Sequence, residues 1–170
     1  MLNLIIGGAG SGKSAFAENL IQRLPGQRVY LATMEPFDDE CRARIEKHRA
    51  QRAALGFTTL ERYTDLSGAV LPAGANVLLE DLSNLLANEV FSPAGGGEDA
   101  VRRGLRALHA AAGNLSVVTN ELFSGGADYA EETLAYLRAL ARLNRELAAQ
   151  ADLVVEVVCG LPNVLKGELP

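Results

Sequence analysis

Short apolar runs alternate along the chain with segments whose apolar residues recur at helical spacing. The apolar runs predict buried strands, and the periodic segments predict helices between them. The expected strands are residues 1–6, 28–33, 77–81, 115–121 and 153–159, with a weaker edge strand at 58–63. The expected helices are residues 14–24, 38–54, 82–91, 98–112 and 128–150. This alternation favours an α/β fold with a mostly parallel sheet flanked by helices on both faces, and residues 160–167 turn back as a small extra ribbon.

A glycine-rich loop joins the first expected strand to the first expected helix. It fits the phosphate-binding pattern G-x-x-x-x-G-K-[ST] (P-loop) and consists of Gly7, Gly8, Ala9, Gly10, Ser11, Gly12, Lys13 and Ser14. Glycines let the backbone pass close to a phosphate, and the loop N–H groups and the helix N-terminus then face the anion. The pattern predicts that Lys13 pairs with the β- and γ-phosphates and that the Ser14 hydroxyl binds Mg²⁺. The alternative is a glycine-rich turn that matches by chance, but the strand–loop–helix context favours the P-loop.

Polar residues follow several of the apolar strands. Ligands of parallel α/β sheets bind at the carboxyl ends of the strands, where Gly7, Thr33, Glu80, Asp81, Asn120 and Glu121 are expected to lie. Glu80 follows the strand register most closely and is the better candidate to hold Mg²⁺, directly or through water. Asp81 is the second candidate, and a solvated strand end or a helix cap is the alternative for both. Glu121 is a further candidate carboxylate.

The expected helix 38–54 carries an unusual number of cations, namely Arg42, Arg44, Lys47, Arg49 and Arg52. A solvated face with cations near a helix C-terminus is the simplest explanation. Cys41, Ile45 and His48 have the spacing of one apolar stripe, and a histidine in such a stripe is more often structural than catalytic. His109 is interpreted as structural, because it lies at the edge of a leucine face.

The long expected helix 128–150 has a single polar member on its predicted stripe. Asn144 is either a buried, hydrogen-bonded residue or one that faces a ligand. The other members of this stripe are Ala130, Leu134, Leu137, Ala141 and Ala148.

The composition is that of an ordinary globular protein. The length of 170 residues favours one domain spanning 1–170, and a net charge of −5 argues against a general nucleic-acid binder. The two cysteines, Cys41 and Cys159, lie far apart and are expected to be buried or half-buried. The sequence shows neither a signal peptide nor a membrane-spanning run, so a cytoplasmic location is expected.

Motifs along nearly the whole chain resemble one family. They are the P-loop, Tyr30-Leu31-Ala32-Thr33, Asp39-Glu40, Ala43-Arg44-Ile45-Glu46-Lys47-His48-Arg49, Leu78-Leu79-Glu80-Asp81-Leu82-Ser83 with Asn88, Val118-Thr119-Asn120-Glu121, Asn144-Arg145-Glu146-Leu147-Ala148 and Cys159-Gly160-Leu161-Pro162. The chain is similar to the bifunctional adenosylcobinamide kinase/adenosylcobinamide-phosphate guanylyltransferases of cobalamin biosynthesis. The resemblance implies a RecA-like P-loop fold and a homotrimer. The segment A-R-I-x-x-H after Y-L-A-T is more specific than the P-loop, which many families share.

The resemblance also implies a two-part chemistry. A nucleoside triphosphate, ATP or GTP, first gives its γ-phosphoryl group to the hydroxyl of adenosylcobinamide, with Lys13 and Mg²⁺ offsetting the charge. The imidazole of His48 then attacks the α-phosphorus of GTP, expels pyrophosphate, and passes the guanylyl group to adenosylcobinamide phosphate. The product is adenosylcobinamide-GDP. Arg44, Lys47, Arg49 or Arg52 would help to bind the triphosphate or the acceptor phosphate.

The chain departs from the family pattern in three places. Gly10 stands where the family usually has arginine, Leu122–Ala127 replaces a V-G-x-G-I-V-P-like stretch, and Ala139 replaces an aspartate. Two other functions remain open from the residues: a P-loop small-molecule kinase in which His48 is structural, and a nucleotide-dependent switch that binds partners.

Overall fold

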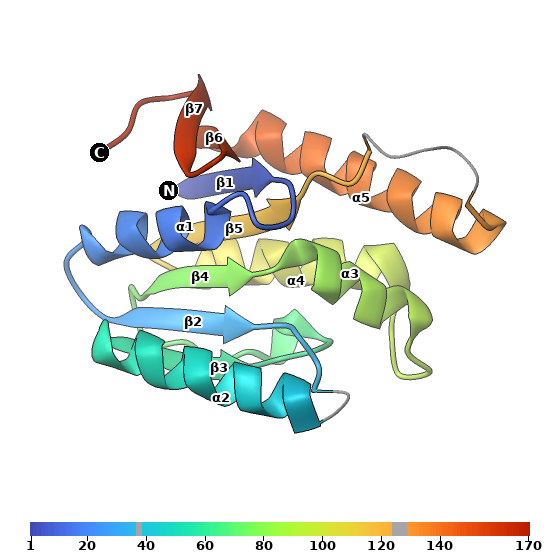
Figure 1. The fold of residues 1–170 in the computed structure, drawn as a ribbon, viewed down its shortest axis with the longest axis horizontal. Coiled ribbons are helices and arrows are strands. Elements are labelled where there is room, and N and C mark those ends of the chain that lie inside the picture. The colour runs from blue at the N-terminus through green and yellow to red at the C-terminus, as the bar shows by residue number, and fades with distance from the viewer. Residues whose placement is uncertain (37–38, 124–128) are drawn as a thin grey trace.

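The strands of the described residues form one seven-stranded sheet with the P-loop strand near its middle (Figure 1). The computed structural model describes residues 1–36, 39–123 and 129–170. The strand order is β3-β2-β4-β5-β1-β6-β7. All pairings are parallel except that of β7, which runs antiparallel to β6. The strands are β1 (Leu2–Gly7), β2 (Arg28–Ala32), β3 (Phe57–Glu61), β4 (Asn76–Glu80), β5 (Asn114–Asn120), β6 (Leu153–Val158) and β7 (Leu161–Lys166).

Helices cover both faces of the sheet because the strands are apolar on both sides. One face packs against α1 (Lys13–Gln22), with α2 (Asp39–Ala54) lying along the β2–β3 edge (Figure 1). The other face packs against α3 (Leu82–Phe91), α4 (Gly97–Ala111) and α5 (Glu131–Gln150). A short 3₁₀ helix, η1 (Leu66–Gly68), adds Leu66 to that core. The expected α/β class, with a mostly parallel sheet between two helical layers, is confirmed.

Most expected elements are confirmed within a few residues, but details of three expectations are wrong. On α5 the buried residues are Ala139, Leu140, Leu143, Asn144 and Leu147, so the predicted stripe was offset around the helix. Ala130, expected in that stripe, is exposed. Cys159 is exposed because it lies in the β6–β7 turn, whereas Cys41 has its side chain outside the described part. Strand β4 ends at Glu80, and Asp81 lies beyond it. Among the described residues, no helix is long and apolar enough to cross a membrane.

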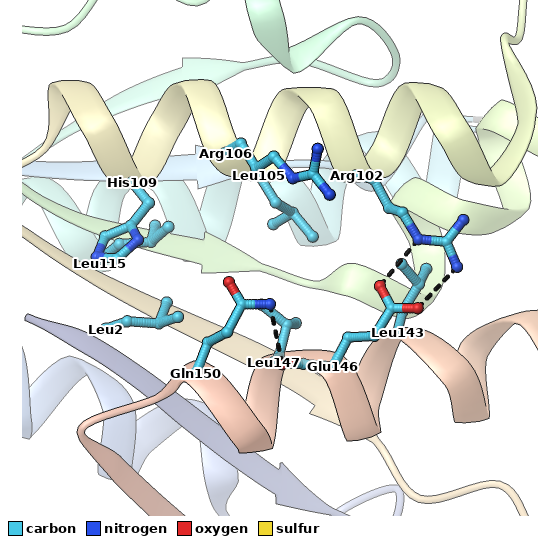
Figure 2. A pocket seen from close by; sticks show the side chains of 10 residues that line it. All are labelled: Leu2, Arg102, Leu105, Arg106, His109, Leu115, Leu143, Glu146, Leu147 and Gln150. Carbon is cyan, nitrogen blue, oxygen red and sulfur yellow. Dashed lines mark hydrogen bonds and ion pairs between the residues drawn. The ribbon is translucent and has the colours of Figure 1, made fainter.

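A small cavity of about 50 Å³ lies between α4 and α5 (Figure 2). It is far from the P-loop, because Leu2, at the amino end of β1, lies in its wall. His109 lines this cavity from α4, with Arg106 one turn away. Arg102 donates from its Nε to Glu146 Oε2 at 2.9 Å, which ties the two helices together. The cavity is too small for a nucleotide, and the prediction that His109 is structural remains a prediction.

Candidate functional site

The phosphate loop is a backbone turn whose shape depends on glycine. Gly10 and Gly12 have φ values of 70° and 91°, a region that residues with a Cβ rarely adopt. Ser11 N–H donates to the Gly8 carbonyl at 3.2 Å and closes the turn. Helix α1 then begins at Lys13, directly after the loop. The strand–loop–helix context predicted for the P-loop is therefore present.

The turn between β6 and β7 packs against the P-loop. Gly160 N–H donates to the Ser11 carbonyl at 2.8 Å. A Cβ on Gly12 would lie 3.1 Å from the Gly160 Cα, and a Cβ on Gly7 would lie 2.6 Å from the Val157 carbonyl oxygen. These close approaches explain why glycine is needed at positions 7 and 12 independently of any ligand.

Lys13 and Ser14 lie at the start of α1, next to the end of β4. The Lys13 side chain is buried, with 7% exposed, and its Nζ donates to the Gly8 carbonyl at 3.3 Å. The Ser14 hydroxyl donates a hydrogen bond to Glu80 Oε1. This bond joins the first turn of α1 to the end of β4, which lies two strands from β1 in the sheet. The structure thus brings together the two residues predicted to bind Mg²⁺.

Glu80 is desolvated, and its second carboxylate oxygen is unused. Burial raises its pKa to about 7, against the lowering effect of the Ser14 hydrogen bond; the negative charge of Asp81 adds to the rise. Glu80 Oε2 is buried and has no hydrogen-bond partner within the described part of the chain. A hydroxyl and an orphaned carboxylate oxygen are hard oxygen ligands of the kind that Mg²⁺ prefers. The donor set therefore fits the predicted ion.

Asp81 acts as the N-cap of α3, the alternative that the sequence left open. Its Oδ1 accepts the Asn84 backbone N–H at 2.7 Å, and its Oδ2 accepts the Asn120 side-chain amide at 3.0 Å. Its backbone N–H donates to the Thr33 hydroxyl at 2.8 Å, and that hydroxyl in turn donates to the Asp81 carbonyl. Thr33 is fully buried. Thr33 and Asn120 thus fix the position of Asp81 at the rim of the site.

A cavity of about 200 Å³ opens beside Ser14 and Glu80, between α1, α2 and the ends of β2 and β4. It is several times the size of the cavity between α4 and α5. Its lining residues are Ser14, Glu18, Tyr30, Ala32, Met34, Ile45, Arg52, Glu61, Glu80, Asp81 and Asn84. The cavity mixes apolar walls with a few carboxylates and one arginine, as ligand pockets generally do.

Helix α2 contributes Ile45 and Arg52 to this cavity. Arg52 is buried, and its Cζ lies 3.6 Å from the centroid of the Tyr30 ring. Arg49 is half-exposed and lies 3.8 Å from a carboxylate oxygen of Glu61, another lining residue. His48 belongs to α2 and stands between Ile45 and Arg52 in sequence, but its side chain lies outside the described part of the structure.

Other predicted residues lie apart from the cavity lining or serve the fold. Glu121 follows β5, and its Oε1 accepts the backbone N–H of Phe123 at 2.8 Å. Asn144 is buried and accepts a hydrogen bond from the Thr119 hydroxyl at 2.9 Å. Of the departures from the family pattern, Leu122 and Phe123 are exposed, residues 124–127 lie outside the described part, and Ala139 is buried in the core.

Sequence reasoning gave no site role to three residues that shape the site, although Tyr30 and Asn88 belong to motifs of the family resemblance. Glu18 and Tyr30 line the cavity, and Asn88 donates to the carbonyls of Thr33 and Tyr63 at 2.8 and 3.0 Å. The spacing of Glu18, one turn after Ser14, was the only available signal for it. Tyr30 has the sequence pattern of an ordinary strand residue. The hydrogen bonds of Asn88 go to segments far away in the sequence, so no local sequence pattern predicts them.

The chain matches known proteins over almost its whole length. The model of the family described as cobinamide kinase/cobinamide phosphate guanyltransferase matches residues 3–165. The bifunctional adenosylcobalamin biosynthesis protein CobP of Pseudomonas aeruginosa is 33% identical over 99% of both chains. The CobU proteins of the same description from Escherichia coli and Salmonella typhimurium are 34% and 35% identical, over 98% of this chain and 100% of theirs.

Among solved structures, the P4 protein of bacteriophage phi6 in complex with ADP aligns at 13% identity with a TM-score of 0.45. The alignment covers 96% of this chain and 52% of that chain. The family assignment rests on the full-length sequence relatives, and it agrees with the P-loop geometry and the Ser14–Glu80 contact. The chain belongs to the cobinamide kinase/cobinamide phosphate guanyltransferase family, a family of transferases.

Proposed function

We propose that this chain phosphorylates adenosylcobinamide with ATP or GTP and then transfers GMP from GTP to adenosylcobinamide phosphate, giving adenosylcobinamide-GDP. The observation that carries the proposal is the cavity of about 200 Å³ that opens directly beside Ser14 and Glu80. A nucleotide whose phosphates lie on the P-loop would have room there for a reacting partner. Full-length identity of 33–35% to proteins named as bifunctional supports both activities in one chain.

In the first reaction the loop N–H groups and Lys13 bind the β- and γ-phosphates. Lys13 is already desolvated, so its charge acts strongly on a phosphoryl group. Ser14 Oγ and Glu80 Oε2 would hold Mg²⁺, which offsets charge on the transferring group when bound. Ser14 gives up its hydrogen bond to Glu80 in that arrangement.

In the second reaction His48 is the nucleophile. Its Nε2 or Nδ1 lone pair forms a bond to the α-phosphorus of GTP, the α–β bridging P–O bond breaks, and pyrophosphate leaves. The acceptor phosphate oxygen then takes the guanylyl group and frees the imidazole. Residues three and four apart are neighbours on a helix, and Ile45 and Arg52 both line the cavity. We therefore propose that His48, three residues after Ile45 and four before Arg52, acts on a nucleotide bound at this cavity.

The cations of α2 differ in how well they suit a phosphate. Arg52 is buried in the cavity wall, so its charge would act on a ligand with little screening by solvent. Arg49 is half-exposed beside Glu61. We propose Arg52 as the main phosphate-binding arginine of α2, with Arg49 at the rim. Thr33 acts through Asp81, because its hydroxyl is used by that backbone.

We further propose a homo-oligomer, a trimer by family resemblance, that works in the cytoplasm. Exposed apolar side chains on and after β7 support an assembly surface: Leu161, Val164, Leu165 and Leu169. Light scattering coupled to size-exclusion chromatography would measure the mass. A monomer at micromolar concentration would contradict the proposal.

The decisive experiment for guanylyl transfer is acceptor-free labelling. The protein and a His48→Ala variant are incubated with Mg²⁺ and GTP labelled at the α-phosphate, then denatured. We expect a protein-bound label that mild acid removes and that the variant lacks, because a phosphoramidate is acid-labile. Absence of label on folded, GTP-binding protein would favour a simple kinase. Retention of phosphoryl transfer by His48→Ala would separate the two activities.

A further inference from the structure

Arg52 and Tyr30 form a stacked pair in the cavity wall. Tyr30 comes from the middle of β2 and Arg52 from the last turn of α2, and the Arg52 Cζ lies 3.6 Å from the centroid of the Tyr30 ring. Both residues are almost completely buried, with 5% and 7% of their surface exposed. A guanidinium over the face of an aromatic ring is attracted by the negative charge of that face, and more strongly when water is excluded.

One hydrogen-bond donor of the Arg52 guanidinium is left unused by the described residues. Its Nε is buried and has no hydrogen-bond partner within the described part of the chain. Burial raises the pKa of Glu18, and the positive charge of Arg52 partly offsets that rise. A desolvated guanidinium with an unused donor, in the wall of an open cavity, is suited to an anion that arrives from outside.

The Tyr30 ring also packs against a second aromatic residue. Phe57 of β3 meets it edge to face, with centroids 6.4 Å apart and ring planes at 90°. The Tyr30 hydroxyl stays protonated, because burial, reinforced by the charge of Glu80, raises its pKa far above the ordinary value. The ring therefore offers Arg52 a neutral aromatic face.

We propose that Tyr30 is a positioning residue, which holds the Arg52 guanidinium in the orientation that binds the phosphates of the nucleotide or of the acceptor. The proposal rests on the phosphate-binding role of Arg52 described above. An arginine side chain loses rotamer freedom when it grips an anion. Because the ring restrains Arg52 before the ligand arrives, binding no longer has to order the side chain.

The test compares GTP affinities of full-length variants by calorimetry, with thermal unfolding measured in parallel. We expect Tyr30→Leu to raise the Kd about fivefold and Tyr30→Phe to change it less than about twofold, since phenylalanine keeps the ring face. Phe57→Leu removes the other ring of the aromatic pair but keeps the Tyr30 face on which Arg52 stacks. It should lower the melting temperature and leave the Kd within about twofold of the native value.

A double variant shows whether Tyr30 acts through Arg52. Arg52→Ala alone should raise the Kd about tenfold or more, and adding Tyr30→Leu should then have no further effect. Replacement of Tyr30 by 4-cyanophenylalanine keeps the packing but weakens the ring face, so it should resemble Tyr30→Leu even if that variant folds poorly. Equal losses in Tyr30→Leu and Phe57→Leu, or a full Tyr30→Leu effect without Arg52, would overturn the inference.

Binding by the single variants separates the phosphate-binding role of Arg52 from the positioning role of Tyr30. If Arg52→Ala binds GTP and the phosphorylated acceptor as tightly as the native chain, the phosphate-binding role of Arg52 is wrong and the inference falls with it. If Arg52→Ala binds weakly while Tyr30→Leu binds normally, only the positioning role of Tyr30 is wrong.

Discussion

The Ser14 hydroxyl donates a hydrogen bond to Glu80 Oε1 and so joins the first turn of α1 to the end of β4. The other carboxylate oxygen of Glu80 has no partner among the described residues. The free protein therefore already brings together two groups that would share a metal ion. Their contact decides how the site responds to substitution and to pH.

Glu80→Gln should lower kcat for phosphoryl transfer by about 100-fold or more, because the amide is a poor ligand for Mg²⁺ and carries no charge. The GTP affinity measured without metal should change little. Glu121→Gln is the matched control, since Glu121 also follows a strand but does not line the cavity. Steady-state kinetics over a range of Mg²⁺ concentrations measures both variants. Equal losses in the two variants would contradict the metal-binding role of Glu80.

The raised pKa of Glu80 makes the stability of the free protein depend on pH. The carboxyl titrates near 4.5 when unfolded and near 7 when folded, so the folded chain binds the proton more tightly. This contribution to the free energy of unfolding is fully present below about pH 4.5 and is lost as pH rises through about 7. The loss is on the order of 3 kcal/mol.

Glu80→Gln isolates that effect, because glutamine does not titrate. The difference in unfolding free energy between the variant and the native protein, measured with urea, should grow in favour of the variant from pH 4.5 to 7.5. A difference that stays constant over this range would show that Glu80 titrates normally. The measurement is made with neither nucleotide nor metal.

Asp81 should contribute to stability as a helix cap as well as to the site. Asp81→Ala removes the acceptor for the Asn84 N–H and for the Asn120 amide, so we expect a loss of about 1–3 kcal/mol in the free energy of unfolding. Asp81→Asn keeps one acceptor oxygen and should lose less. Urea denaturation at pH 7 compares the two. If Asp81→Ala left the free energy of unfolding unchanged, water would have replaced the side-chain cap.

The glycines of the loop should differ in their tolerance of a side chain. Gly12→Ala places a Cβ 3.1 Å from the Gly160 Cα at a φ of 91°, so it should cost about 1–3 kcal/mol of stability. Gly8→Ala is the control for stability, because no atom outside its chain neighbours lies within 4 Å of the added Cβ. We expect Gly8→Ala to change the unfolding free energy by less than about 0.5 kcal/mol. Thermal unfolding distinguishes the two.

Local pattern was enough to predict much of the fold and the centre of the site. The P-loop and Glu80 stand at the ends of apolar runs, and their positions follow from the parallel sheet that those runs imply. The face of α5 was predicted wrongly, because several stripes of a leucine- and alanine-rich helix are apolar. Packing against the sheet, which selects the stripe around Leu140 and Leu143, is not encoded in spacing alone.

Two of the missed residues, Asn88 and Tyr30, act across large distances in sequence. Asn88 connects Thr33 to Tyr63, and Tyr30 meets Arg52 across the β2–α2 connection. Such contacts are set by strand order and helix placement, so only the folded chain reveals them. For the same reason, the sequence could not show whether Asp81 binds metal or caps α3. The hydrogen bond from Asn120 to Asp81 Oδ2 depends on the position of strand β5.

The bond from Gly160 N–H to the Ser11 carbonyl links two segments separated by most of the sequence. The conformation of the P-loop is therefore coupled to the β6–β7 turn. A substitution at Val157 or Gly160 that shifts this turn would also displace the loop backbone, although neither residue belongs to the phosphate-binding motif.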